Sequence, residues 1–414
     1  MRIIAVFILT FFSVIYTNLR AQNIDLKTIM GGEVFTGAWP KDVQYNAFGD
    51  TVFFYRKNEL DTLPQWFALA GGQEVRIQDD YKARFGQRIP HPVNSNIFLW
   101  KQSNAIYKGN LKAKSLDPIV VSHQTIKNLR WIGVTQDFVF TQGENIIRYN
   151  NGSFLTIGVF TKEQNDTQNK EQKWLENQQS MFDVLTLRKQ REEANNNSKE
   201  SKSPFPKIKT AYSGSLSNIQ VANDYSTFWF TTSEREDEHT EYMDYVTHSG
   251  FSEAQKARSK VGMTEVRQQL LHYSCKTDSI IKIDLKTLPG IYTPPEFLKS
   301  GKDSLDQPKS VYILGPVLNP YNNWGLVTIK SNDNKDRWII FVHPEKDWVL
   351  VDDQHDDTWI GGHGITGWNM VQGNVGWFDK GDKVYYQSEK TGYSHLYGYD
   401  LTSQQKSALT QGDF

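Results

Sequence analysis

The strongest constraint on the fold of this 414-residue chain is a short strand–turn–strand pattern that recurs along it. The clearest copy is the C-terminal stretch 377–414, WFDKGDKVYYQSEKTGYSHLYGYDLTSQQKSALTQGDF. Apolar and polar residues alternate over 383–387 and 394–399, polar turns follow each run, and a last strand begins near Lys406. The stretch therefore predicts a four-stranded antiparallel blade whose last strand is incomplete.

Weaker copies of this pattern lie upstream. Each combines a short apolar strand with a tight polar turn, and they occupy 66–77, 105–110, 146–152, 271–278 and 338–346, with the second turn at Lys108–Asn110. Phe67, Tyr107 and Ile147 hold equivalent positions about 40 residues apart, which is the period of propeller blades. The later intervals are longer and indicate insertions.

These repeats predict an all-β fold, a β-propeller with about 7–8 blades in the full domain and an incomplete C-terminal blade. Aromatic residues make up 13% of the chain, which suits flat side chains packed on pleated strands. A closed ring of small sheets also leaves few free strand edges. A stack of β-sandwiches is the alternative, but sandwiches do not produce a near-constant repeat length.

Two segments interrupt the repeat. Residues 161–204 form a charged insertion with a predicted amphipathic helix over 171–194, whose Trp174, Met181 and Leu185 recur at helical spacing. Residues 233–262 open with the charged run SEREDEHTEYMD. This second segment is predicted to be a long excursion between two strands of one blade.

The N-terminus predicts export. Arg2 precedes an apolar run over 3–16, and Ala21 is a small residue at a plausible cleavage point, so residues 1–21 are interpreted as a signal peptide. An uncleaved membrane anchor is the alternative. The expected location is periplasmic or extracellular, and a net charge of −1 provides no field that would attract nucleic acid.

Sequence motifs of catalysis are absent from the chain. The nearest approach to G-x-S-x-G, Gly250–Ala254, lacks the final glycine, and no P-loop, dinucleotide fingerprint or H-E-x-x-H is present, so no cofactor is predicted. The run Asp352–Asp357 is interpreted as a solvated turn rather than a metal site. The single Cys275 excludes an internal disulfide and is expected to be a packed or half-buried thiol. No carboxylate pair suggests glycoside cleavage.

Three stretches resemble a known family. They are SNDNKDRW (331–338), DDQHDDTWIGGHGITGW (352–368) and YYQSEKTGYSHLYGYDL (385–401). They resemble the N-terminal propeller of the dipeptidyl peptidase IV branch of the prolyl oligopeptidase family, of the Bacteroidetes type. The resemblance extends over most of 52–414 and is most specific over 331–401, so residues 22–414 are interpreted as this propeller domain.

The resemblance implies a serine peptidase whose propeller caps a C-terminal α/β-hydrolase domain carrying Ser, Asp and His in that order. The sequence stops at Phe414 before any such domain. No catalytic residue is assigned, and the chain alone is expected to be inactive. The parent enzyme would act on peptides and could be a homodimer.

The resemblance also indicates where a substrate would bind. Dipeptidyl peptidases of this family hold the free α-amine of the substrate with a Glu pair on a short helix after a Trp. The comparable stretch here is WLENQQSMF (174–182), which has Gln178 and Gln179 at the pair position and only Glu176 as an acid nearby. Glu176, Gln178 and Gln179 are the predicted substrate-binding residues. Because a neutral amide holds an ammonium more weakly than a carboxylate does, strict dipeptide release is not implied.

Two functions are compatible with this pattern. The first is a non-catalytic propeller that gates substrate access in an exported serine peptidase and helps to bind the peptide N-terminus. The second is a stand-alone periplasmic propeller that binds a peptide or protein partner. Coding DNA downstream of Phe414 distinguishes them, because the first function requires a G-x-S-x-G further along.

Overall fold

The structure is a computed structural model. It describes residues 25–30, 37–57, 63–77, 85–162, 206–210, 215–234, 239–245, 247, 250–259, 266–295, 304–361, 365 and 372–413. The predicted signal peptide and the predicted helix over 171–194 lie outside the described residues. The chain divides into two compact units, one made of Met1–Arg88, Trp100–Ser103 and Tyr107–Asp117, the other of Ile89–Leu99, Asn104–Ile106 and Pro118–Phe414.

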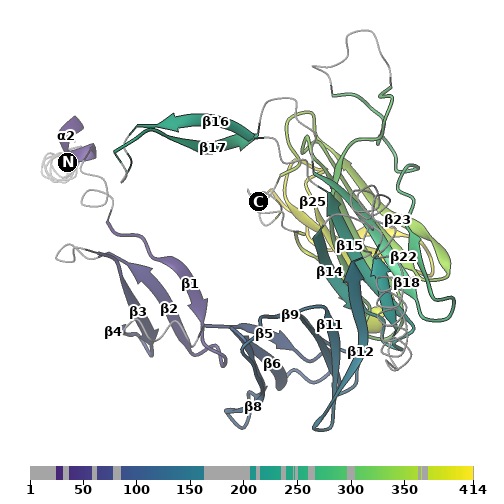
Figure 1. Cartoon of the computed structure of the whole chain (residues 1–414), viewed down its shortest axis with the longest axis horizontal. Coiled ribbons are helices and arrows are strands. Elements are labelled where there is room, and N and C mark those ends of the chain that lie inside the picture. Colours follow the sequence, from purple (N-terminus) through teal and green to yellow (C-terminus); the bar gives the residue numbers. More distant parts are fainter. Residues whose placement is uncertain are drawn as a thin grey trace, which may run out of the picture. The chain divides into compact units, whose positions relative to one another are not determined.

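The described residues are almost entirely β-structure, arranged in six larger sheets and one separate hairpin (Figure 1). Sheet 1 contains β1 (Lys41–Tyr45), β2 (Thr51–Arg56), β3 (Gln65–Ala70) and β4 (Gln73–Ile77). Sheet 2 contains β5 (Gln87–Pro90), β6 (Ile97–Gln102), β7 (Ala105–Asn110) and β8 (Ser115–Val121). Sheet 3 contains β9 (Ile126–Trp131), β10 (Phe138–Gln142), β11 (Asn145–Asn150), β12 (Ser153–Lys162) and β13 (Lys207–Thr210).

Three sheets follow toward the C-terminus. Sheet 4 contains β14 (Ser215–Val221), β15 (Thr227–Glu234), β18 (Arg267–Ser274) and β19 (Ser279–Lys282). Sheet 5 contains β20 (Val311–Leu318), β21 (Gly325–Ser331), β22 (Asp336–His343) and β23 (Lys346–His355), and sheet 6 contains β24 (Val375–Phe378), β25 (Lys383–Ser388), β26 (His395–Asp400) and β27 (Lys406–Ala408). The separate hairpin pairs β16 (His239–Asp244) with β17 (Glu253–Ser259).

Helical structure is slight in the described part of the chain. It consists of the short helix α2 (Leu26–Ile29) and the 3-10 turn η4 (Asp379–Gly381). No helix among these residues is long and apolar enough to cross a bilayer. The predicted all-β fold, built from repeated blade-sized sheets, is confirmed.

The repeat found in the sequence corresponds to one strand of each sheet. Phe67, Tyr107 and Ile147 lie in β3, β7 and β11, which are the third strands of sheets 1, 2 and 3. The later copies of the pattern coincide with β18, β22 and β26, again third strands. One predicted turn is wrong: Lys108–Asn110 is the end of β7, and the chain turns at 111–114 instead.

Sheet 6 has the four antiparallel strands predicted for the C-terminal blade, whereas the incompleteness of its last strand stays a prediction. Lys383 pairs with Asp400 and Ser388 with His395, so β25 and β26 are in register along their whole length. The outer strand β27 has three residues, and beyond it the amide of Leu409 still donates to the carbonyl of Leu396 at 2.8 Å.

The predicted excursion between two strands of one blade is confirmed as well. β15 and β18 are neighbours in sheet 4, and their pairing extends without a shift from Thr227 opposite Ser274 to Glu234 opposite Arg267. The hairpin of β16 and β17, here called the excursion hairpin, lies between them in sequence and forms a two-stranded sheet of its own.

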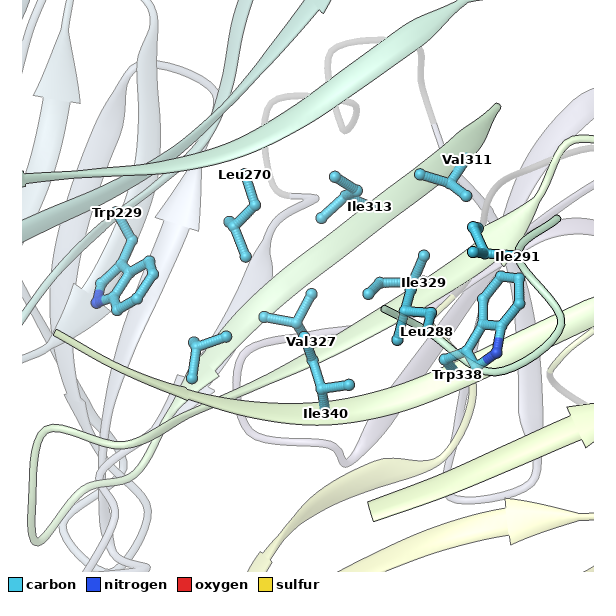
Figure 2. Close-up of a cluster of buried hydrophobic side chains, with 11 residues drawn as sticks. Trp229, Leu270, Leu288, Ile291, Val311, Ile313, Val327, Ile329, Trp338 and Ile340 are labelled. Carbon is cyan, nitrogen blue, oxygen red and sulfur yellow. The ribbon is translucent and has the colours of Figure 1, made fainter. Parts of the chain in front are cut away.

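The cores lie between successive sheets, because the inner sheets bury both of their faces. In β22, Trp338 and Ile340 belong to an apolar cluster with residues of sheet 4 (Figure 2), whereas Ile339 and Phe341 belong to a cluster with residues of sheet 6. All four of these side chains are at most 4% exposed. A strand buried on both faces gains roughly 1.5–3 kcal/mol for each large apolar side chain removed from water.

Hydrogen bonds join the turns between the first and second strands of successive sheets. His91 Nε2 of sheet 2 lies 2.9 Å from the carbonyl of Thr135 in sheet 3. In sheet 4, Asn223 Oδ1 accepts from the amide of Gly133 in sheet 3, and Asn223 Nδ2 donates to the carbonyl of Asn319 in sheet 5. Asn319 Nδ2 donates in turn to the carbonyl of Gly381 in sheet 6. These turns, here called the turn joints, link five sheets.

Asn223 is the central member of the turn joints. It accepts from Arg130 Nη2 at 3.0 Å and from the Gly133 amide at 2.9 Å, and it donates to the carbonyls of Asn319 at 2.7 Å and Asn322 at 2.8 Å. All four contacts reach neighbouring sheets. An amide is required, since only an amide combines an acceptor with two donors in one short side chain.

The substitution Asn223→Ala is expected to lower the free energy of unfolding of the chain by roughly 2–4 kcal/mol, because four hydrogen bonds are lost and their partners become unpaired. Urea unfolding followed by Trp fluorescence measures the change. Asn323→Ala is the matched control, since the Asn323 amide lies in a neighbouring turn but makes one exposed bond, to Asp224 at 2.6 Å. Equal effects of the two substitutions would contradict the role of the turn joints.

Candidate functional site

The three predicted substrate-binding residues, Glu176, Gln178 and Gln179, lie outside the described residues. The described structure does show where their insertion is attached. β12 and β13 are adjacent parallel strands of sheet 3, with Val159 opposite Lys207, so the segment between them leaves and rejoins the same sheet. Phe160 and Ile208 are 4% and 0% exposed in a shared apolar cluster, which makes this attachment a buried, well-packed base.

The excursion hairpin lies in the sequence between β15 and β18 of sheet 4. Its strands pair from His239 opposite Ser259 to Asp244 opposite Glu253. The segment that came nearest to G-x-S-x-G, Gly250–Ala254, lies at the turn of this hairpin and at the start of β17. A nucleophile elbow needs a strand followed by a helix, so this position does not have the geometry of a catalytic serine.

A cavity of about 590 Å³ lies where β18 and β19 of sheet 4 meet the chain leading into β20 of sheet 5. This volume is typical of pockets that bind small ligands, which measure roughly 300–1,000 Å³. Leu270, Ile291 and Val311 line it and also belong to the apolar cluster of Figure 2. The full lining comprises Arg267, Gln268, Gln269, Leu270, Lys282, Ile283, Asp284, Leu285, Lys286, Ile291, Gln307, Pro308, Lys309, Ser310 and Val311.

The charges around this cavity are mostly positive. Arg267, Lys282, Lys286 and Lys309 line it, against Asp284 as the one carboxylate in the lining. The ammonium of Lys309 is held by Asp336 and lies 3.3 Å from Asp333. A cavity with this balance is unsuited to the free α-amine of a peptide.

A polar cluster borders Lys309. Asp336, which is 6% exposed, contacts the ammonium of Lys309 through one oxygen and His355 Nδ1 at 2.6 Å through the other. His355 Nε2 lies 3.2 Å from Asp357. The hydrogen bond to Asp336 is the main cause that raises the pKa of His355, and burial opposes it.

This cluster corrects the interpretation of the run Asp352–Asp357 as a turn. Strand β23 continues to His355, and only Asp356 and Asp357 of the run follow it. Asp352 is 5% exposed and accepts from Lys406 Nζ at 2.7 Å. Asp352 and His355 of this run pair with charged groups of neighbouring strands. The spacing of residues along the chain does not reveal such pairs. Among the described residues no group of three or more His, Cys, Asp and Glu side chains is arranged to hold a metal ion.

Cys275 is exposed, so the expectation of a packed or half-buried thiol is wrong. β18 ends at Ser274, and Cys275 opens the turn to β19, where its Sγ lies 3.5 Å from the carbonyl oxygen of Tyr225. Partial desolvation is the main cause that raises the pKa of this thiol, with the charges of Asp224 and Asp278 adding to it. A raised pKa leaves little thiolate at neutral pH and does not suit a nucleophile.

Residues 324–414 match the family model described as "Dipeptidyl peptidase IV (DPP IV) N-terminal region". This match confirms the resemblance that the sequence shows most specifically over 331–401, and it covers β21 to β27. No curated protein matches the chain.

Two solved structures are similar to the whole chain at a low level. One is of a protein from Bacteroides ovatus assigned as a dipeptidyl aminopeptidase IV, with 12% identity, a TM-score of 0.40 and coverage of 91% of this chain and 48% of the other. The other is dipeptidyl peptidase 4 of Porphyromonas gingivalis, with 13% identity, a TM-score of 0.40 and coverage of 94% and 49%. The chain therefore spans about half the length of these proteins, and the likeness is too weak to carry an argument.

The cluster around His355 predicts a pH-dependent contribution to stability. A His whose folded-state pKa is raised stabilises the fold below its unfolded-state pKa of about 6.5, and this contribution disappears as pH rises through the folded-state pKa. His355→Gln is therefore expected to lower the free energy of unfolding more at pH 5.5 than at pH 8.5, as measured by urea unfolding at both pH values.

His343 provides a control of opposite sign. Burial is the main cause that lowers its pKa, and its Nδ1 accepts from the amide of Glu345, which requires a neutral ring. A lowered pKa gives a contribution that is present above the unfolded-state pKa and disappears as pH falls. His343→Gln should thus cost more at pH 8.5 than at pH 5.5, and the same pH trend in both variants would contradict the assignment for His355.

Proposed function

We propose that this chain is the non-catalytic propeller portion of an exported serine peptidase, where it limits access to the active site and helps to bind the N-terminus of peptide substrates. The observation that carries the proposal is the match of residues 324–414 to the dipeptidyl peptidase IV N-terminal region. Export through the signal peptide 1–21 and a homodimeric parent enzyme are parts of the same proposal.

The fold is compatible with a binding role for the insertion. A site for a peptide amine must be held on a rigid base, and the insertion that carries Glu176 starts and ends on β12 and β13, which bury Phe160 and Ile208. The cavity beside sheet 5 is mainly cationic and would repel an ammonium. The insertion is therefore the better location for the contact with the peptide N-terminus.

The first test of this function is an assay of the full 414-residue chain with a chromogenic dipeptidyl substrate. No hydrolysis is expected, because a Ser-Asp-His triad is assigned to a domain outside this sequence. Hydrolysis that survives serine-reactive inhibitors and copurifies with the chain would overturn the proposal of a non-catalytic portion.

The second test concerns the peptide N-terminus. A tripeptide with a free α-amine is expected to bind the chain more tightly than its N-acetylated form, and Glu176→Gln should weaken the free-amine form by about 10-fold through loss of one charge-assisted hydrogen bond. Gln179→Glu should strengthen it, since a carboxylate holds an ammonium better than an amide does. Isothermal titration calorimetry measures the affinities.

The N-acetylated tripeptide is the matched control in this experiment, because it has no charged amine. Its affinity should be the same for the parent chain and both variants. Equal responses of the free-amine and acetylated peptides to Glu176→Gln would contradict an amine contact at this residue. That result would still leave the family match of residues 324–414 unchanged.

A further inference from the structure

Two buried cations lie side by side on the face of sheet 5 that packs against sheet 6. Lys330 in β21 and Arg337 in β22 are directly opposite each other, and they are 4% and 0% exposed. Like charges directly opposite on adjacent strands repel each other. Burial adds to the cost, because a buried cation needs an opposite charge close by.

The acceptors that these cations contact are all neutral. Arg337 donates from Nη1 to Gln354 Oε1 at 3.1 Å and to the carbonyl of Gln387 at 2.8 Å, and from Nη2 to the carbonyl of Gln372 at 3.0 Å. Lys330 Nζ donates to the carbonyl of Ile365 at 3.2 Å. Carbonyl and amide oxygens satisfy hydrogen bonds but do not neutralise two charges.

The buried carboxylate nearby belongs to another cation. Asp352 accepts from Lys406 Nζ at 2.7 Å and from the hydroxyl of Tyr386 at 3.3 Å. The charge of Asp352 acts to raise the pKa of Arg337, but the two side chains form no ion pair. Asp352 is therefore paired with Lys406, and neither Lys330 nor Arg337 forms an ion pair with it. Burial is the main cause that lowers the pKa of Lys330, and the charge of Arg337 lowers it further.

Lys309 shows how the same sheet compensates a buried lysine elsewhere. Its side chain is 6% exposed, like that of Lys330, but it contacts the carboxylates of both Asp336 and Asp333. The pair of Lys330 and Arg337 has no equivalent partner among the described residues.

Two residues at this pair of cations have a buried donor without an acceptor. Arg337 Nε and Gln372 Nε2 are both buried without a hydrogen-bond partner. The two residues are in contact, because the backbone carbonyl of Gln372 accepts from Arg337 Nη2. A buried guanidinium N–H without an acceptor destabilises the fold, and an acceptor supplied by a bound ligand removes that cost.

We propose that Lys330, Arg337 and Gln372 form a binding site for a small oxyanion between sheets 5 and 6. A carboxylate or a phosphate matches the donors chemically, since a guanidinium and an ammonium prefer charged oxygens and the amide of Gln372 adds a third donor. The proposal uses other residues than the proposed contact with the peptide amine and does not depend on it. The anion is either a free ion or the carboxylate of a peptide.

The test measures the melting temperature of the 414-residue chain in a chloride buffer of constant ionic strength with increasing inorganic phosphate or acetate. Binding to the folded state alone stabilises it by mass action, so a saturable rise of about 2–6 °C is expected. Calorimetric titration of the same anions checks that the rise comes from binding. No saturable rise and no heat of binding with either anion would overturn the proposal.

Variants locate the site. Lys330→Met is expected to reduce the affinity for the anion at least 10-fold while keeping the melting temperature in chloride at or above that of the parent chain, because it removes an uncompensated buried charge. Gln372→Ala should weaken the affinity less and serves if Lys330→Met does not fold. Lys383→Gln, at an exposed lysine, is the control and should leave the anion response unchanged. An equal anion response in Lys330→Met and the parent chain would contradict the site.

A final comparison separates the two sources of the anion. A tripeptide with a free C-terminal carboxylate and its C-amidated form are titrated into the parent chain and into Lys330→Met. Tight binding of the free-carboxylate peptide with weak binding of phosphate and acetate assigns the site to a peptide. The reverse order assigns it to a free ion. If neither the free-carboxylate peptide nor phosphate nor acetate binds the folded parent chain, the proposal is rejected.

Discussion

The turn joints are the contacts on which the arrangement of successive sheets depends. A four-stranded sheet of three- to ten-residue strands is too small to be stable alone, and it must bury its apolar faces against neighbours. Apolar burial is non-directional, so it does not determine how two sheets are aligned. The hydrogen bonds of Asn223 and Asn319 are directional, and each spans two sheets at the same turn of the repeat. The contact of Asn319 requires glycine at position 381, because a Cβ there would collide with the amide of Asn319 and because the φ of Gly381 is +89°.

The strand repeat was predictable because tight polar turns leave a strong local signal. Third strands end in such turns in every sheet, so Phe67, Tyr107 and Ile147 were recognised as equivalent and the spacing of the blades followed. The same reliance on local signals produced the error at Lys108–Asn110, where Gly109 indicated a turn although β7 continues through it. A glycine can occupy a strand when the neighbouring strand holds the backbone, and spacing along the chain contains no information on that neighbour.

Charged residues were harder to interpret for a physical reason. In a sheet with one wet face, a polar residue between apolar ones points to water. Sheet 5 has no such face along its central strands, and all seven residues of β21 are buried, including Lys330 and Ser331. Polar positions of β22 and β23, such as Arg337 and Asp352, consequently face another sheet. The candidate residues of the insertion, Glu176, Gln178 and Gln179, rest on the family resemblance and stay a prediction.

The two faces of sheet 5 differ in kind, and this difference bears on function. The face toward sheet 4 is apolar around Val327, Ile329 and Trp338, and the cavity of about 590 Å³ opens beside it. The face toward sheet 6 combines aromatic packing with buried charges. Replacing a buried ionic group by a well-packed apolar one is often neutral or stabilising, so stability alone gives no reason to keep Lys330 and Arg337 there. A group that is costly to the fold and useless to packing is most simply explained by a partner that it binds.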